Sequence, residues 1–287
     1  MAISPAFKAF YDKQHAYFRD QYDIASKYLL TGAIHDMRVC LKQLRTFFGL
    51  IEAVDSRFHA EECFGPARRL FRAAGKVRNL HVLEARVRQA SKDHGLELSE
   101  YYNWLKEGER REGREFRRVC RRFDAAFFGS SWKTIASSLE GLTSLRVRKG
   151  TEARLSGLLK SLREENSPVR SVARLHFLRI QSKEARYTLG IVRGDRTADD
   201  ETASLDSLLR GVHQSLGRWH DDEMVLKTLR EFRKDGATGP FFSSKSYVEF
   251  SRLTRTSKAG NLAEFEASWK ALSNYLEAHE TKADNPA

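Results

Sequence analysis

The chain has 287 residues, which is enough for one large domain or two of ordinary size, and it can bury a core without disulfide staples. Lysine and arginine number 50 against 38 aspartates and glutamates, which gives a net charge of +12 and a pI near 9.7. This charge favours a polyanionic partner: nucleic acid, an anionic membrane surface or an inorganic phosphate polymer. The three cysteines have no CxxC spacing, so neither a disulfide framework nor a zinc site is expected.

No stretch approaches 18 uninterrupted apolar residues, and charges occur throughout the first 14 residues. We therefore expect a cytoplasmic protein without a membrane partner. Only five prolines occur, and no sustained alternating run of Val, Ile and Thr is present. The composition thus predicts an all-α fold.

Apolar residues recur at three- and four-residue steps along most of the chain and predict a series of helices. In chain order these are residues 3–28, the helix of His35 to about residue 54, 57–74, 77–89, 99–128, 132–139, 151–163, the helix of His176 to about residue 193, 203–233, 244–258 and 261–279. Gly75 is expected to interrupt the chain between the third and fourth of them.

The helix of His35 divides its residues into two columns at helical spacing. The apolar column, expected to face the core, is Ile34, Met37, Leu41, Leu44 and Phe48. A cationic column that begins with a histidine lies one residue out of phase with it and consists of His35, Arg38, Lys42 and Arg45. In a single helix such a column would most simply be a solvated face.

The same cationic column returns 141 residues later, as His176, Arg179, Lys183 and Arg186. Four further basic pairs keep the same separation, namely Arg69 with Arg210, Arg111 with Arg252, Arg114 with Arg255, and Arg117 with Lys258. These spacings predict a tandem repeat with a first helical bundle at residues 1–142 and a second at residues 143–287.

The two helices resemble the signatures of the CHAD domain, the conserved histidine α-helical domain. The second one matches the pattern L-H-x-x-R-x-x-x-K-x-x-R-Y in full, from Leu175 to Tyr187. The first matches H-x-x-R-x-x-x-[RK]-[RK]-x-R except at Gln43, where the family usually has a second consecutive basic residue. The family's G-x-x-R-D turn is similar to the segments that begin at Gly75 and Gly217, although Asn79 replaces the usual acid in the first.

The resemblance covers about residues 5–280 and implies an all-α fold, a pseudo-twofold pair of helical bundles with a basic central groove or pore. It also implies inorganic polyphosphate as the ligand, a location that includes polyphosphate granules, and partners among polyphosphate-metabolising enzymes or granule proteins. We accordingly expect binding without catalysis, metal or cofactor, through His35, Arg38, Lys42, Arg45, His176, Arg179, Lys183 and Arg186.

The chemistry of the cationic columns suits an extended anion. Arginine presents a planar fork of donors to phosphate oxygens, and lysine a compact point charge. On a helix that rises about 1.5 Å per residue, the column from His35 to Arg45 spans roughly 15 Å. Each histidine has three interpretations: packing against a neighbouring carboxylate, donating to phosphate, or ligating a metal.

A second set of cations is a candidate for an outer wall of the same groove, with a solvated face as the alternative. Its members are Arg69, Arg72, Lys76, Arg111, Arg114, Arg117, Arg118, Arg121, Arg210, Arg252, Arg255 and Lys258.

Two other functional classes share some of these features. A metal-dependent phosphoanhydride hydrolase would need a metal site, and residues 219–223 form the only dense acidic cluster; GxxxxGK[ST], HExxH and GxSxG motifs are all absent. A nucleic-acid-binding protein shares the electrostatics but normally adds base-stacking aromatics or base-reading amides among the cations. The two histidine motifs lack these residues, so we expect neither an enzyme nor specific nucleic-acid binding.

Overall fold

A computed structural model describes residues 5–165, 171–194, 200–235, 242 and 244–283, and within these residues the protein has nine α-helices and no strand. The expected all-α fold is confirmed. The helices are α1 (Pro5–Tyr28), α2 (Thr31–Val54), α3 (Ala60–His94), α4 (Ser99–Cys120), α5 (Phe127–Leu139), α6 (Ser144–Glu164), α7 (Val172–Arg193), α8 (Asp200–Lys234) and α9 (Lys245–Ala283). Across the described ranges, none of them is both long and apolar enough to cross a membrane.

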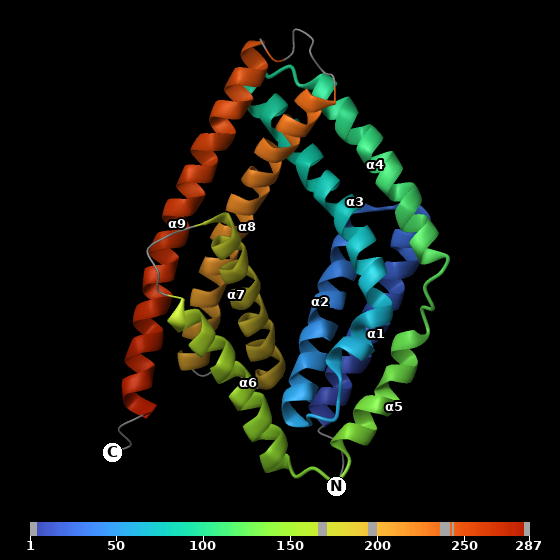
Figure 1. The fold of residues 1–287 in the computed structure, drawn as a ribbon, viewed down its shortest axis with the longest axis vertical. Helices are drawn as coiled ribbons and strands as arrows, with labels where there is room; N and C mark the ends of the chain where they lie inside the picture. Colours follow the sequence, from blue (N-terminus) through green and yellow to red (C-terminus); the bar gives the residue numbers. More distant parts are fainter. Residues whose placement is uncertain (1–4, 166–170, 195–199, 236–241, 243, 284–287) are drawn as a thin grey trace.

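The helices form two arms that are joined at both ends (Figure 1). One arm holds α1 to α5, and the other holds α6 to α9. At one end α2 packs against α6 and α7, and at the other end α3 and α4 contact α8. Because α2 and α7 carry the two cationic columns, the first of these joints is where the columns can meet.

Three hydrophobic clusters hold this arrangement. The first is built mainly from α1 to α5 around Phe47, Phe48 and Phe128 and also includes Ile191 of α7, and the second is built from α6 to α9 around Leu178 and Phe265. The third contains residues of both arms, and its members include Leu83, Tyr101, Val225, Phe232 and Phe250. The arms are therefore joined by an apolar core of their own as well as by the contacts of α2.

The expected apolar column of α2 is confirmed. All five of its members, Ile34, Met37, Leu41, Leu44 and Phe48, are fully buried. Burying large aliphatic and aromatic side chains stabilises the fold by about 1.5–3 kcal/mol each. This fixes the rotation of α2 about its axis, so the cationic column one residue out of phase lies at the edge of the core.

Several predicted helix boundaries are wrong, including the starts of α5 at Phe127 and of α6 at Ser144, where residues 132 and 151 were expected. α3 runs without a break through Gly75, and α9 is one helix where two were expected. In α9 the amide of Asn261 donates to the buried carboxylate of Asp222 at 2.7 Å, so packing on α8 keeps the helix continuous across the expected break. α4 ends at Cys120, and Asp124 accepts a hydrogen bond from the backbone N–H of Ala126 at 2.9 Å in the turn that follows.

The boundary predicted after residue 142 falls in the connection between α5 and α6. The order α2, α3, α4 in the first arm parallels α7, α8, α9 in the second, and α3 and α8 both have 35 residues. This correspondence is consistent with a division into two repeats. The division and the pseudo-twofold relation of the repeats remain predictions.

A buried carboxylate ties α3, α8 and α9 together. Asp222 on α8 is fully buried and accepts from Arg86 of α3, from Ser257 at 2.8 Å and from Asn261 at 2.7 Å, the last two on α9. Removing a buried charge that has such partners strongly destabilises the fold, because the partner side chains are left without a counter-charge or a hydrogen-bond acceptor.

We predict that Asp222→Ala lowers the free energy of unfolding by about 3 kcal/mol, since Arg86 loses its buried counter-charge. Urea denaturation measures the effect. Asp23→Ala, at an exposed position on α1, is the control and should change the value by less than about 0.5 kcal/mol. Equal effects of the two substitutions would contradict the role given to Asp222.

Candidate anion-binding site

The two cationic columns meet where α2 packs against α7. Arg38 and Lys42 of α2, and Arg179 and Lys183 of α7, are half-buried at this contact. Three of the four follow a buried apolar residue of their own helix, namely Met37, Leu41 and Leu178, and Lys183 follows the buried Ser182, which is why burial reaches their aliphatic stems. We call these four side chains the inner cluster.

The side-chain amino groups of Lys42 and Lys183 adjoin one another across the contact between the helices. Burial, followed by the charges of Lys183 and Arg38, lowers the pKa of Lys42 to about 6. Burial also lowers the pKa of Lys183, to about 8, and the neighbouring arginines contribute to this. Within the described residues, neither lysine has a carboxylate at ion-pair distance. The centre of the cluster thus lacks counter-charge.

Arg38 is held in place by α3. Its Nη1 donates to the backbone carbonyl of Phe71 at 2.5 Å, and its guanidinium lies 4.3 Å from the centre of the Phe71 ring. A Cβ atom at Gly75 would come within 2.7 Å of the same Nη1. The glycine that was expected to break the helix therefore makes room for the arginine. Burial, with the charges of Arg78 and Arg179, lowers the pKa of Arg38 to about 10.

Arg179 is the cluster residue that faces an acidic group. Burial lowers its pKa, and the carboxylate of Asp221 on α8 opposes that shift. Burial raises the pKa of Asp221, while Arg179 and Arg86 lower it. The Nε of Arg179 is buried without a hydrogen-bond partner in the described structure. It is an orphaned donor within a positively charged cluster.

The outer ends of both columns are paired with carboxylates. Arg45 lies 3.3 Å from Glu61 and 5.6 Å from the centre of the Phe64 ring. Arg186 lies 3.5 Å from Asp206. The uncompensated charge is thus concentrated in the middle of the columns, at the inner cluster.

The two histidines that head the columns are exposed. Nδ1 of His35 lies 2.9 Å from Oδ1 of Asp36, and Oδ2 of the same carboxylate accepts from the hydroxyl of Tyr17 at 2.9 Å. The ring of His176 lies 5.8 Å from that of His220 on α8. In the parts of the chain that the structure describes, no group of three or more His, Cys, Asp or Glu side chains could hold a metal ion.

Three residues of the site were missed by the sequence reasoning. His213 and His220 on α8, and Arg78 on α3, all have lowered pKa values because they are buried; His213 also faces cations of α7, and His220 faces Arg179. His213 lies four residues before Gly217, in the segment of α8 that packs on α7. No local sequence pattern marks His213, because its position in the site depends on how α8 packs on α7.

The twelve additional cations lie on α3, α4, α8 and α9, except Arg121, which directly follows α4, and the charges that shift the pKa values of the inner cluster include none of them. Several form ion pairs: Arg69 with Glu115, Lys76 with Glu112, Arg118 with Glu115, Arg210 with Asp206, Arg252 with Glu249 and Lys258 with Glu223. The other six, Arg72, Arg111, Arg114, Arg117, Arg121 and Arg255, are exposed. Their part in binding remains a prediction.

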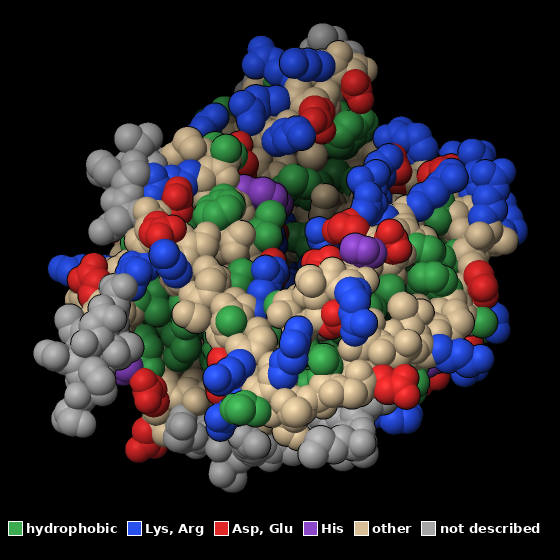
Figure 2. All heavy atoms as spheres, turned by 60° about the horizontal axis from the view of Figure 1, so that its bottom comes forward, with side chains coloured by type: hydrophobic (Ala, Val, Ile, Leu, Met, Phe, Trp, Pro, Cys, Tyr) green, Lys and Arg blue, Asp and Glu red, His purple; other side chains and the backbone are tan. Residues whose placement is uncertain are grey.

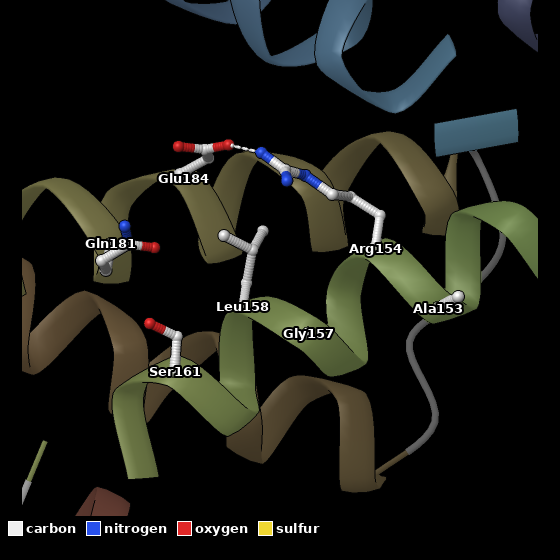
Figure 3. A pocket seen from close by; sticks show the side chains of 7 residues that line it. All are labelled: Ala153, Arg154, Gly157, Leu158, Ser161, Gln181 and Glu184. Carbon is white, nitrogen blue, oxygen red and sulfur yellow. Dashed lines mark hydrogen bonds and ion pairs between the residues drawn. The ribbon is translucent and has the colours of Figure 1, made fainter. Parts of the chain in front are cut away.

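The surface is hollowed near the centre of the face drawn in Figure 2, and Lys, Arg, His and acidic side chains lie around the hollow. A separate cavity of about 360 Å³ lies between α6 and α7 (Figure 3). It is lined by Ala153, Arg154, Gly157, Leu158, Ser161, Gln181 and Glu184, and Arg154 and Glu184 form an ion pair across its edge. It contains no member of the inner cluster.

Comparison with known proteins agrees with the all-α fold. The family model of the CHAD domain matches residues 27–230, and the chain belongs to that family. The fold is similar to the crystal structure of the CHAD domain from the plant Ricinus communis, with a TM-score of 0.70 at 18% identity, covering 96% of this chain and 92% of that one. It is also similar to PptA from Streptomyces chartreusis, with a TM-score of 0.59 at 13% identity, covering 91% and 99%. No curated protein matches the sequence.

We predict that substitution by alanine changes the free energy of unfolding differently at the two corresponding glycines, Gly217 and Gly75. Gly217→Ala should raise the free energy of unfolding by about 1 kcal/mol, because this helix-interior position has open space around it. Gly75→Ala should lose that gain, because the new Cβ displaces the Arg38 guanidinium from Phe71. Chemical denaturation of both variants provides the comparison, and equal gains would show that Arg38 is not confined by Gly75.

Proposed function

We propose that this protein binds inorganic polyphosphate, without catalysis, through the cationic columns of α2 and α7. The observation that carries the proposal is the meeting of Lys42 and Lys183 in a half-buried position without a carboxylate partner in the described structure. Buried like charges are costly, and an anion that enters between them relieves the repulsion. Membership of the CHAD family, which is associated with polyphosphate, supports the choice of anion.

The shape of the site favours a polymer over a single phosphate. Arg38 and Lys42 are one helical turn apart on α2, and Arg179 and Lys183 are one turn apart on α7. Donors therefore follow one another along two helices at steps of about 6 Å. A linear chain of phosphates offers charges along its whole length, whereas orthophosphate satisfies only one part of the cluster.

The proposed role is a binding one, with no chemical step assigned to the site. Recruitment to polyphosphate granules, and association with granule proteins or with enzymes of polyphosphate metabolism, would follow from such binding.

We predict that long-chain polyphosphate binds at physiological salt and outcompetes duplex DNA and single-stranded RNA. Changing Arg179, Lys183 and Arg186 together to Ala should weaken binding by about 100-fold or more, since several charge-assisted hydrogen bonds are lost. Competition titrations followed by fluorescence anisotropy measure both effects.

The matched control is Arg146, Arg148 and Lys149 changed together to Ala, which removes the same residue types from exposed positions on α6. This variant should lose affinity only modestly, through the reduced net charge. Equal losses of affinity in the two triple variants, or equal affinity for all three polymers, would show that binding is only nonspecific electrostatic attraction to a basic surface.

We also predict that saturating polyphosphate raises the melting temperature, because the ligand neutralises the repulsion at the inner cluster. At a ligand concentration 100 times Kd, the stabilisation is about 2.7 kcal/mol. Differential scanning fluorimetry detects the shift. Orthophosphate at the same phosphate concentration should raise the temperature less, and a melting temperature unmoved by polyphosphate would count against the proposal.

A further inference from the structure

His213 occupies an unusual position on α8. Both of its ring nitrogens are buried and lack a hydrogen-bond partner in the described structure. The charges that face the ring all belong to cations, with Lys183, Arg179 and Arg186 on α7 and Lys42 on α2. A buried imidazole with two unsatisfied nitrogens is costly, and the surrounding positive charges hold it in the neutral form, with one N–H donor and one acceptor nitrogen.

Lys42 lies in a similar environment at the centre of the site. Arg38 faces it from its own helix, Lys183 and Arg179 face it from α7, and its Nζ lies 6.0 Å from the centre of the Phe71 ring of α3. The acidic groups nearby are directed elsewhere, since Asp206 pairs with Arg186 and Asp221 faces Arg179, Arg78 and Arg86.

The phenol of Tyr187 is also half-buried at this point and faces Arg186 and Arg179. Its ordinary pKa is already near 10, and burial raises it further, so the phenol stays protonated. The groups at the centre of the site that can gain a proton near neutral pH are therefore Lys42 and His213, together with the partly protonated Lys183; His220, which faces Arg179 and His176, is a further neutral imidazole beside them.

We propose that each binding event at the α2–α7 site carries protons from solvent into the protein, onto Lys42 and His213. This inference deepens the proposed function and rests on it. Interior phosphates of the polymer are fully ionised near neutral pH, so they supply the negative charge that the site lacks. Lys42 then becomes an ammonium group, and His213 becomes an imidazolium whose two N–H groups donate to phosphate oxygens.

The direction in which polyphosphate affinity changes with pH follows from the pKa values of the empty protein. Burial and Lys183 hold the pKa of Lys42 at about 6, and burial and Lys183 hold that of His213 at about 3. The bound anion raises both values. The complex therefore holds more protons than the empty protein above pH 6, and affinity falls as pH rises, by up to about tenfold per pH unit for each proton taken up.

The test is isothermal titration calorimetry of the intact protein with long-chain inorganic polyphosphate at pH 7.5. The titration is repeated in buffers of different ionisation enthalpy, because the slope of observed enthalpy against buffer enthalpy gives the number of protons taken up. We expect about one proton or more for the wild type, together with an affinity that falls between pH 6.5 and 8.5.

Two variants assign the protons to residues. Lys42→Arg keeps a cation that does not titrate, and His213→Gln keeps a polar side chain without a titratable ring, so each should bind with a smaller slope. Their controls are Lys160→Arg and His59→Gln, at exposed positions on α6 and before α3, which should leave the slope unchanged.

The outcomes separate this inference from the proposed function. Tight binding with a zero slope in the wild type would overturn proton uptake and leave polyphosphate binding intact. Absence of binding heat in every buffer, with an unmoved melting temperature, would overturn both. A wild-type slope that Lys42→Arg and His213→Gln both leave unaltered would place the protons elsewhere and overturn the assignment.

Discussion

The repulsion between Lys42 and Lys183 is the constraint on which the site depends. The two side-chain amino groups adjoin each other in a half-buried position, with Arg38 and Arg179 beside them, and burial together with these charges keeps Lys42 largely unprotonated in the empty protein near neutral pH. Such an arrangement costs free energy in the empty protein, and the rest of the fold has to hold it in place. The same cost becomes binding free energy when an anion arrives, so stability and function are opposed at this point.

Several features of the fold oppose this repulsion. The apolar face of α2 is fully buried from Ile34 to Phe48, which prevents the helix from rotating its cations away. The Phe71 carbonyl and ring hold Arg38, and Asp221 offsets the charge of Arg179. Because carboxylates compensate only the outer ends of the columns, at Arg45 and Arg186, the middle remains available to a ligand.

The sequence predicted the helical class, the apolar face of α2 and the cations that meet, because all of these follow from spacing along single helices. It predicted the breaks at Gly75 and in α9 wrongly, because tertiary contacts decide whether a helix continues. Gly75 looks like a helix breaker in the sequence, whereas in the structure it leaves space for Arg38. His213 was missed because its position in the site depends on how α8 packs on α7, which no local pattern encodes.

The long helices α3 and α8 also act as lever arms. Each has 35 residues, and each carries site residues near its middle and members of the third hydrophobic cluster toward its end. Gly75 and Val87 are twelve residues apart, which is about 18 Å along α3. A tilt of α3 by about five degrees at Val87 would therefore move Gly75, and Arg38 with it, by roughly 1.5 Å. The spacing of the cations is thus set in part by apolar packing at a distance from any of them.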